Sequence, residues 1–281
     1  MDSNTIIEST DATFQQDVIE RSHELPVIVD FWAEWCGPCR VLGPTLEQLA
    51  EEFGGQVQLV KVDTDANQQV SLQHGISSIP AVKAFRDGQM VDEFVGALPE
   101  PQVREFFQRV LPSDADGFAA EGDAALLSGD FEGAQGRFES ALGLDSQHAA
   151  AAIGLAAALV ELGEIDSAEQ YAVPHRGEPR ARQVLARVAI LRTAVGVDRE
   201  AIEARIATNN GDVEAHYRLG ALMLATGEWE SGFDHLFEVV MRDRKFEEDG
   251  GRLRVLDGLE LLGDGNVLTD EIRSRLSNLL F

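Results

Sequence analysis

The sequence predicts an α/β domain with a mixed sheet, followed by an all-α domain built from helix pairs. Strand-like and helix-like segments alternate as far as residue 111. Beyond residue 117 the composition shifts to Ala, Leu, Glu and Gly without strand-like runs, and a short pattern with a central glycine recurs. A chain of 281 residues is long enough for about two domains, each with its own core. We therefore place the first domain at 1–111, a polar linker at 112–117 and the second domain at 118–281.

The order of segments in the first domain defines its expected layers. The hydrophobic spacing predicts a strand at 26–33, a helix at 38–53, a strand at 57–63, a short helix at 67–75, a hairpin at 81–96 and a helix at 99–111. Asp87-Gly88 supplies the hairpin turn between two apolar runs. A β-α-β start followed by a hairpin and a helix predicts a mixed central sheet with helices on both faces.

The charge balance argues against nucleic acid as a partner. Lys and Arg number 23 against 49 Asp and Glu, a formal net charge of −26, whereas nucleic-acid binding depends on basic side chains that neutralise phosphates. Such acidity fits a solvated surface, or long-range selection of basic or unfolded partner proteins. The start MDSNTIIEST does not resemble a signal peptide, and no apolar run approaches the ~20 residues of a membrane span. We expect a cytoplasmic protein without membrane contact.

The two cysteines stand in the stretch Trp35-Cys36-Gly37-Pro38-Cys39, between a predicted strand and a predicted helix. Cys36 is therefore expected at or just before the helix N-terminus, where free N–H groups and the helix dipole favour a thiolate. Since the thiolate is the reactive form, Cys36 is the expected nucleophile. Cys39, one turn later, is placed to attack the mixed disulfide with a client protein and to release the reduced client.

Two other functions of the cysteine pair are weighed against redox chemistry. A structural zinc site usually needs four ligands, and the chain has no second cysteine pair, while its six histidines are scattered without ligand spacing. A structural disulfide across so short a loop would constrain little of the unfolded chain. We expect no metal, and no cofactor besides the redox-active Cys36–Cys39 disulfide/dithiol itself.

Two further features favour redox chemistry. Asp30 interrupts the apolar run VIVDFW, where a carboxylate is costly to bury. Burial should raise the pKa of Asp30 and suit it to take the proton from Cys39; a plain polar residue at the strand end is the alternative. Ile79-Pro80 directly precedes a strand, a position that suits a cis peptide bond as well as a trans proline that starts the strand.

Residues 5–110 resemble thioredoxin. The resemblance rests on VDFWAEWCGPC at 29–39, Pro44 in the next helix, KVDTD at 61–65, GISSIPA at 75–81, FRDGQ at 85–89 and VGALP at 95–99. It implies an α/β thioredoxin fold with Cys36 as nucleophile and Cys39 as resolving thiol. It further implies a buried Asp30 with Lys61 as its charge partner, and a cis Pro80 facing the disulfide. The surface implied to grip an extended client comprises Trp35, Gly37, Pro38, Ile79 and Gly96.

The second domain contains an internal repeat. LLSGDFEGAQ (126–135) recurs as VELGEIDSAE (160–169) and LATGEWESGF (224–233), and LELLGDGNVL (259–268) is a candidate fourth copy. Gly129 and Gly163 are 34 residues apart, the period of the tetratricopeptide repeat (TPR), a helix-turn-helix unit. In each copy we expect Gly to end the first helix, Asp or Glu to cap the second, and a small residue to permit close crossing. These TPR-like helical repeats would hold peptides or partner proteins; an all-α bundle that only steadies the first domain is the alternative.

Two segments fall outside this pattern. Residues 175–196 predict one amphipathic helix after Pro179, with arginines that pair with the acidic repeats or form a binding patch: Arg176, Arg180, Arg182, Arg187 and Arg192. The last helix carries apolar residues at helical spacing. We weigh burial of this stripe on the preceding repeat against a partner-binding site formed by Ile272, Leu276, Leu279, Leu280 and Phe281.

A thioredoxin-like domain, TPR-like repeats and the closing segment MRDRKFEEDGGRLRVLDGLELLGDG…RSRLSNLLF together resemble the chaperedoxin family, also called YbbN or CnoX. The resemblance implies a bacterial co-chaperone that holds unfolding or oxidised client proteins during oxidative stress and exchanges disulfides with them. It would pass clients to the chaperonin GroEL or to DnaK, and a thioredoxin-reductase-type system would recycle it. The alternatives are a protein-disulfide reductase whose TPR region only selects substrates, and a structural adaptor, which the complete Cys36/Cys39 pair disfavours.

Overall fold

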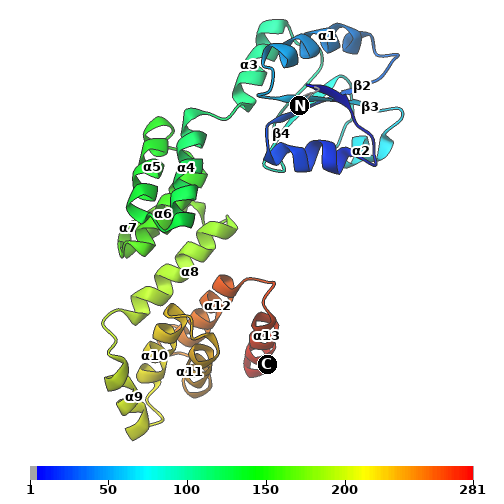
Figure 1. Cartoon of the computed structure of the whole chain (residues 1–281). Coiled ribbons are helices and arrows are strands. Elements are labelled where there is room, and N and C mark those ends of the chain that lie inside the picture. Colours follow the sequence, from blue (N-terminus) through cyan, green and yellow to red (C-terminus); the bar gives the residue numbers. More distant parts are fainter. Residues whose placement is uncertain (1–4, 281) are drawn as a thin grey trace. The chain divides into compact units, whose positions relative to one another are not determined.

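The computed structural model describes residues 5–280 and, of Leu280, the backbone only. The chain divides into two compact units, Met1–Ser113 and Asp114–Phe281. Among the described residues, the first unit combines a sheet with helices and the second contains helices alone (Figure 1). The predicted fold class, an α/β thioredoxin fold followed by an all-α TPR-like helical repeat domain, is confirmed.

A five-stranded mixed sheet forms the centre of the first unit (Figure 1). The strands lie in the order β1-β3-β2-β4-β5, with β2 parallel to β3 and antiparallel to β4. Their bounds are Ile6–Glu8 (β1), Val27–Trp32 (β2), Gln58–Asp63 (β3), Ala81–Arg86 (β4) and Gln89–Val95 (β5). The central strand β2 is covered on both faces, which explains why it reads as a nearly continuous apolar run.

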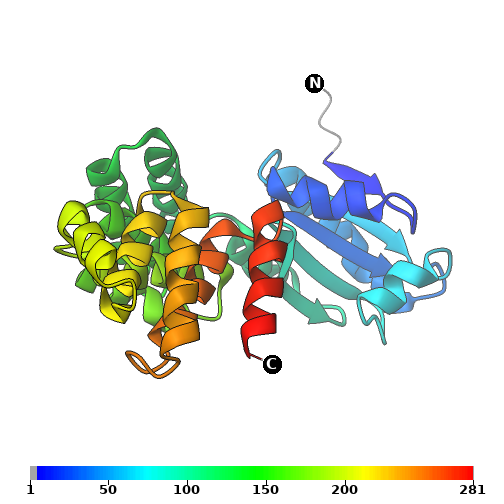
Figure 2. The ribbon, with the colours of Figure 1, turned by 90° about the horizontal axis from the view of Figure 1, so that it is seen from below.

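Helices cover both faces of this sheet (Figures 1 and 2). α1 (Gly37–Glu52) and α3 (Glu100–Val110) pack on one face. On the other face lie α2 (Gln68–Gln73) and the π-helix η1 (Gln15–Glu20), which a 3-10 turn, η2 (Arg21–His23), follows. The predicted elements are present, with ends that differ by one or two residues. β1 and η1 were not predicted; β1, with three residues, is too short for a periodic pattern.

The alternation of side chains along β2 positions Asp30. Ile28 packs in the core beneath α1 and α3, whereas Val29 and Phe31 belong to the core on the opposite face. Since successive side chains of a strand point to opposite faces, Asp30 shares the face of Ile28 and lies on the side of α1. The fold therefore places this carboxyl on the same side of the sheet as the helix that begins at the cysteine pair.

The turn between β4 and β5 adopts the conformation that its residues favour. Asp87 and Gly88 have φ angles of 53° and 77°, so both lie in the left-handed region. Positive φ at both central positions of a two-residue hairpin turn matches the right-handed twist of the strands, and Asp-Gly tolerates it well. The predicted hairpin is confirmed.

The described part of the second unit contains ten α-helices (Figures 1 and 2). Their bounds are Asp114–Ser128 (α4), Phe131–Leu144 (α5), Ala149–Glu161 (α6), Ile165–Ala172 (α7), Pro179–Ala194 (α8), Arg199–Thr208 (α9), Val213–Ala225 (α10), Trp229–Arg242 (α11), Gly250–Leu262 (α12) and Val267–Leu280 (α13). The predicted repeats correspond to the pairs α4/α5, α6/α7 and α10/α11, and the candidate fourth copy to α12/α13.

A glycine in the left-handed region ends the first helix of each pair. The φ angles are 79° at Gly129, 81° at Gly163, 83° at Gly227 and 74° at Gly263. Glycine adopts this conformation without the steric penalty of a Cβ atom, which explains why the same residue type recurs at these turns.

The helical unit begins earlier than predicted. Residues 112–117 were expected to form a linker, but α4 already starts at Asp114. The physical reason is that Asp114 and Asp116 lie in the first turn of α4, where carboxylates interact favourably with the N–H groups and the dipole of a helix. Most of the polar segment that was expected to be a linker is therefore the first turn of α4.

The predicted caps of the second helices form only in part. Asp130 accepts a hydrogen bond from the N–H of Gly133 at 3.0 Å and so caps α5. Glu164 and Glu228 occupy the equivalent positions of α7 and α11 without a capping hydrogen bond from their side chains, so the prediction is wrong there. The carboxylate of Glu228 instead pairs with Arg199 at 2.7 Å.

Small residues permit close helix crossing, as predicted. A Cβ atom at Gly232 on α11 would lie 2.8 Å from a methyl carbon of Leu224 on α10. A Cβ atom at Gly220 on α10 would lie 2.9 Å from the carbonyl oxygen of Gly232. Both distances are too short for real carbon contacts, so these two helices approach as closely as they do because both positions are glycine.

Three arginines of the predicted basic cluster pair with acidic residues of neighbouring helices. From α8, Arg180 reaches Asp123 on α4 at 2.5 Å, Arg182 reaches Glu260 on α12 at 3.1 Å, and Arg192 reaches Asp166 and Glu169 on α7 at 2.8 Å. Of the two predicted roles for these side chains, pairing with the acidic repeats is therefore the one observed.

Candidate active site

The cysteine pair lies at the junction of β2 and α1. Cys36 is the N-cap residue of α1, and its backbone is extended rather than helical. Its Sγ accepts a hydrogen bond from the N–H of Cys39 at 3.2 Å. Pro38 stands in the first turn, where a missing N–H is tolerated. A disulfide joins the two cysteines, whose Cα atoms are 5.3 Å apart.

Both cysteines are nearly buried. Cys36 is 3% exposed and Cys39 4% exposed, and they pack with Ala33, Trp32 and Ile79. The exposed fractions of the two cysteines therefore do not indicate which sulfur atom reacts first. The expectation that Cys36 reacts first rests on its place at the helix N-terminus, where the N–H of Cys39 supports a thiolate.

The Ile79–Pro80 peptide bond is cis, as the resemblance implied. Pro80 is buried just before β4, and its carbonyl oxygen accepts a hydrogen bond from the N–H of Gly96 at 2.8 Å. Ile79 packs against the cysteine cluster. The segment 79–80 is thereby fixed between the cysteine pair and β5.

Asp30 is a buried carboxyl group with an unusual proton affinity. It is 3% exposed, and its Oδ1 has no hydrogen-bond partner among the described residues. Burial, aided by the charge of Glu47 and opposed by that of Lys61, raises the pKa of Asp30 from 3.8 to about 7. Near neutral pH this side chain is therefore present in both its charged and its neutral form.

Lys61 lies beside Asp30 but bonds elsewhere. The two residues are opposite each other in the register of β2 and β3. The ammonium of Lys61 donates to Oε1 of Glu47 at 2.6 Å and lies 5.2 Å from the ring centroid of Trp32. The predicted charge partner of Asp30 is therefore nearby, but Glu47 on α1 binds its ammonium group.

A cavity of about 240 Å³ connects these groups. It is lined by Asp30, Trp32, Cys39, Arg40, Gly43, Pro44, Glu47 and Lys61. The structure thus brings together three predicted site residues, Cys39, Asp30 and Lys61, and adds Glu47, which the sequence reasoning missed. Glu47 follows Cys39 at the helical spacing i+8, with Gly43 at i+4 between them, so the spacing indicates that both lie on one side of α1 but not that Glu47 meets Lys61.

A second, more open pocket of about 530 Å³ lies beside the disulfide. Trp35 and Ile79, both predicted to contact clients, line it together with the exposed Leu72. The indole N–H of Trp35 donates to Asp65 at 2.8 Å, which fixes a ring that is 67% exposed. Sequence reasoning missed Leu72 and Asp65, because α2 and the loop before it meet Trp35 only in the fold.

The remaining predicted client-binding residues do not line this pocket. Gly37 and Pro38 are exposed at the start of α1, and Gly96 is half-buried after β5 with a φ angle of 92°. Gly37 and Pro38 lie next to the cysteines in the chain, and Gly96 is hydrogen-bonded to Pro80 of the cis-proline segment.

The predicted C-terminal partner site is corrected by the structure. Ile272 and Leu276 are buried in a core with Phe233, Phe237 and Leu259, and Leu279 packs half-buried against it. The stripe is covered because α13 packs on α11 and α12. Phe281 and the side chain of Leu280 lie outside the described residues. Ile272 and Leu276 are therefore core residues, and of the two only Leu276 also lines a pocket of the helical unit.

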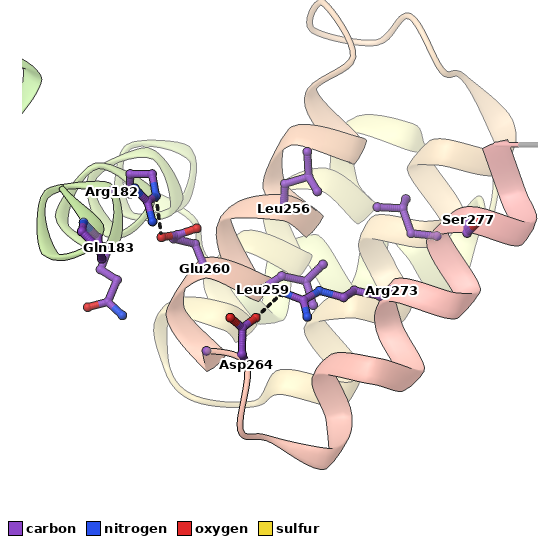
Figure 3. A pocket seen from close by; sticks show the side chains of 11 residues that line it. Arg182, Gln183, Leu256, Leu259, Glu260, Asp264, Arg273 and Ser277 are labelled. Atoms are coloured by element: carbon purple, nitrogen blue, oxygen red, sulfur yellow. Dashed lines mark hydrogen bonds and ion pairs between the residues drawn. The ribbon is translucent and has the colours of Figure 1, made fainter. Parts of the chain in front are cut away.

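The helical unit has a pocket of its own between α8, α12 and α13, of about 750 Å³ (Figure 3). Leu256, Leu259 and Leu276 provide its apolar lining. Two ion pairs, Arg182–Glu260 and Arg273–Asp264, lie at its sides (Figure 3). The pocket combines apolar surface with charges of both signs.

Within residues 5–280 no three His, Cys, Asp or Glu side chains gather in a way that would hold a metal ion. No helix in the same range is both long enough and apolar enough to cross a membrane.

Comparison with known families agrees with this architecture. The family model for thioredoxin matches residues 5–109, and two models for the tetratricopeptide repeat match residues 125–188 and 192–281. Thus the first unit matches one family and the second unit another.

Curated relatives match the first unit. Thioredoxin 1 of Synechococcus elongatus is 54% identical over 91 residues, which cover 32% of this chain and 83% of the relative. Thioredoxin 1 of Nostoc sp. is 45% identical over 102 residues, 36% of this chain and 94% of the relative. Thioredoxin of Haemophilus influenzae is 40% identical over 104 residues, 37% of this chain and 95% of the relative. Together with the Cys36–Cys39 pair, these matches identify a thiol–disulfide oxidoreductase unit. The chain belongs to the thioredoxin family, and TPR repeats follow its thioredoxin domain.

Proposed function

We propose that this protein is a redox-active co-chaperone, which exchanges disulfides with client proteins through its first unit and holds them with its second. The redox part is carried by one observation: the Cys36–Cys39 pair stands at the N-terminus of α1, and Cys39 shares a cavity with the buried Asp30. The co-chaperone part is supported by the presence of a thioredoxin domain and TPR repeats in one chain.

The first step is attack by Cys36. In the reduced protein its thiolate attacks a disulfide of the client, so that a bond forms between Cys36 and one client sulfur. The other client sulfur leaves as a thiolate and takes a proton from solvent. The N–H of Cys39 and the dipole of α1 support the negative charge on Cys36 before the attack.

The second step is release of the client. Cys39 gives its proton to the Asp30 carboxylate and attacks Sγ of Cys36, which forms the Cys36–Cys39 disulfide and expels the remaining client sulfur as a thiolate. Two electrons thus pass from the cysteine pair to the client. Asp30 suits the role of base because burial raises its pKa to about 7, close to neutral pH. A thioredoxin-reductase-type system would return the pair to the dithiol.

The client would lie across the exposed apolar surface next to the disulfide. Trp35, Leu72 and Ile79 line the pocket there, and the cis Ile79–Pro80 segment packs close to the cysteines. An extended segment on this surface would place its own disulfide within reach of Cys36. We assign Lys61 and Pro80 to positioning, and Gly37, Pro38 and Gly96 to the edge of this surface.

Holding of unfolded chains is assigned to the second unit. Stacked helix pairs are a common means of binding peptides and partner proteins. The pocket in Figure 3 offers an apolar lining between ion pairs, with Leu256 39% exposed. A net charge of −26 would keep complexes with aggregation-prone clients apart. From the resemblance to chaperedoxins we infer a bacterial, cytoplasmic role under oxidative stress, with transfer of clients to GroEL or DnaK.

A second candidate function is a protein-disulfide reductase whose TPR region only selects substrates. Selection of substrates by the half-exposed arginines of α8 is disfavoured, because carboxylates of the same unit already pair with three of these arginines. The two candidates differ in one property, the ability to hold a client that has no cysteine.

Suppression of thermal aggregation of a cysteine-free client tests the proposal. The variant Cys36→Ser/Cys39→Ser should suppress aggregation as well as the wild type, because holding would depend on the second unit. The same variant should lose reduction of insulin disulfides. If neither protein suppresses aggregation while the wild type reduces insulin, the reductase candidate is correct. If the double variant alone loses suppression, holding depends on the cysteines and the proposed division of labour is wrong.

A further inference from the structure

Glu47 is a charged residue in the cavity that Asp30, Cys39 and Lys61 also line, and it has no chemical role in the two steps of disulfide exchange. It stands on α1, and its Oε1 accepts the ammonium of Lys61 at 2.6 Å. Lys61 is also the residue directly opposite Asp30 in the β2–β3 register. Glu47, Lys61 and Asp30 line one cavity with Cys39. One ammonium group therefore lies between two carboxyl groups, and it is bonded to the one on α1.

We propose that Glu47 is a positioning residue for release of the client, because it binds the ammonium of Lys61 and thereby preserves the proton affinity of Asp30. The inference rests on the proposed role of Asp30 as the base for Cys39. Glu47 would contact neither the client nor the reacting sulfur atoms, and it would act only through Lys61 and Asp30.

The positions of the three side chains indicate that Glu47 and Asp30 compete for the ammonium of Lys61. Asp30 is 3% exposed, whereas the side chains of Lys61 and Glu47 are 21% and 40% exposed, so the ion pair lies at the mouth of the cavity and Asp30 lies inside. The ring of Trp32, 5.2 Å from the ammonium, further stabilises Lys61 in this position. Because Asp30 Oδ1 has no hydrogen-bond partner among the described residues, it offers an acceptor for the ammonium if Glu47 releases it.

The other groups that face Asp30 do not replace Lys61. From α1, Cys39 and Arg40 line the cavity with Glu47. Arg40 donates to the carbonyl oxygen of Glu34 at 3.2 Å, which directs its guanidinium toward the loop before α1. From β4, the residue paired with Asp30 is the apolar Val82. Lys61 is therefore the cation that decides the charge balance at Asp30.

Loss of the Glu47 charge should lower the pKa of Asp30 in two ways. The direct repulsion between the carboxylates, which raises the pKa of Asp30, disappears. In addition, the ammonium of Lys61 becomes free to approach Asp30, and a nearby cation lowers the pKa of a carboxyl group. Both changes make Asp30 a weaker acceptor for the Cys39 proton. The bonds that form and break in the release step stay the same, and only the base changes in strength.

The variant Glu47→Gln tests the inference, because it keeps the shape of the side chain and removes its charge. The titration midpoint of the Asp30 carboxyl, followed by carbon NMR of the reduced protein, should fall by on the order of one pH unit. Starting from a preformed mixed disulfide at Cys36, the pH profile of client release should shift downward by the same amount. The rate of the initial attack by Cys36 should stay at the wild-type value.

Glu51→Gln is the matched control, since Glu51 is an exposed carboxylate on the same helix. It should leave both the midpoint and the profile unchanged. Glu47→Gln should have no effect on release in an Asp30→Asn background, because coupled residues are not additive. In a Lys61→Met background Glu47→Gln should shift the Asp30 midpoint by less than in the wild type.

Three results would overturn the inference. The first is an Asp30 midpoint in Glu47→Gln equal to that of the wild type. The second is a shifted midpoint with an unchanged release profile, and the third is a full shift in the absence of Lys61. If instead Asp30→Asn releases clients at the wild-type rate at every pH, the role of Asp30 itself fails. That result is distinguishable, because the midpoint in Glu47→Gln is measured independently of activity.

Discussion

Lys61 lies directly opposite Asp30 in the parallel register of β2 and β3, but its ammonium donates to Glu47, 2.6 Å away. Asp30 is thus buried beside a cation whose ammonium group is bonded to another carboxylate. This arrangement stabilises the neutral form of its carboxyl group and makes the stability of the first unit dependent on pH.

The first prediction concerns this dependence. Burial raises the pKa of Asp30 from 3.8 to about 7, so between these values the folded protein binds a proton that the unfolded chain has released. The free energy of unfolding therefore falls as pH rises through this window, by at most about 4 kcal/mol. Asp30→Asn should be more stable than the wild type at about pH 8, by a few kcal/mol, and the difference should disappear below pH 3.8.

Hydrogen exchange of the β2 amides measures this stability without interference from the second unit. Asp17→Asn, in the outer helix η1, serves as the control and should follow the wild-type profile. Equal protection of Asp30→Asn and wild type across the whole pH range would contradict the prediction.

The second prediction concerns the order of reactivity of the cysteines. Cys36 accepts the N–H of Cys39 at the N-terminus of α1, and this environment lowers the pKa of a thiol. Limiting iodoacetamide added to the reduced protein near neutral pH should therefore alkylate Cys36 first. Peptide mass spectrometry separates the two sites. Faster labelling of Cys39 would reverse the assignment, and Cys36→Ser provides the reference rate for Cys39 alone.

The third prediction concerns a histidine pair in the second unit. The Nδ1 atoms of His216 and His235 are 2.8 Å apart, and Nε2 of His216 contacts the carbonyl oxygen of Asn210 at 3.1 Å. This chain of contacts is satisfied when both rings are neutral: His216 donates to Asn210 and accepts from His235. Burial lowers the pKa of His235 and a charge on His216 lowers it further, against the opposing carboxylates of Asp234, Glu238 and Glu203.

Because the unfolded chain takes up the proton at higher pH than the folded one, the stability of the second unit should fall as pH drops below 6.5. His235→Gln removes this titration, so hydrogen exchange of the α10 amides should depend less on pH than in the wild type. His175→Gln, a half-buried histidine of the same unit, is the control. An unchanged dependence in His235→Gln would refute the role of the pair.

The fourth prediction follows from the burial of α13. Ile272 is 3% exposed within a core that includes Phe233 and Phe237. Ile272→Ala should therefore cost about 2–5 kcal/mol of stability in the second unit, because it removes buried methyl groups and leaves a cavity. Leu127→Ala, at a position that is 91% exposed, should change stability by less than about 0.5 kcal/mol. Full stability of Ile272→Ala together with loss of partner binding would restore the docking-site interpretation.

The local features of this protein could be predicted from the sequence because they depend on neighbouring residues. The cysteine spacing, the Asp87-Gly88 turn and the repeated glycines at 129, 163 and 227 each encode a backbone conformation within a few positions. Asp30 was also recognisable, since a carboxyl inside an apolar strand is costly without a function.

The tertiary structure decided which of these residues meet. Glu47 escaped prediction because its relation to Lys61 exists only once α1 packs across β2 and β3. The stripe of Ile272 and Leu276 has the spacing of an amphipathic helix, but spacing does not tell whether the protein's own core or a partner covers it, and here α11 and α12 do so. The sequence by itself determined the cysteine pair, the turns and the repeat. Only the packing of helices on the sheet and on each other, which brings distant residues into one cavity or one core, decided the charge balance at Asp30 and the burial of α13.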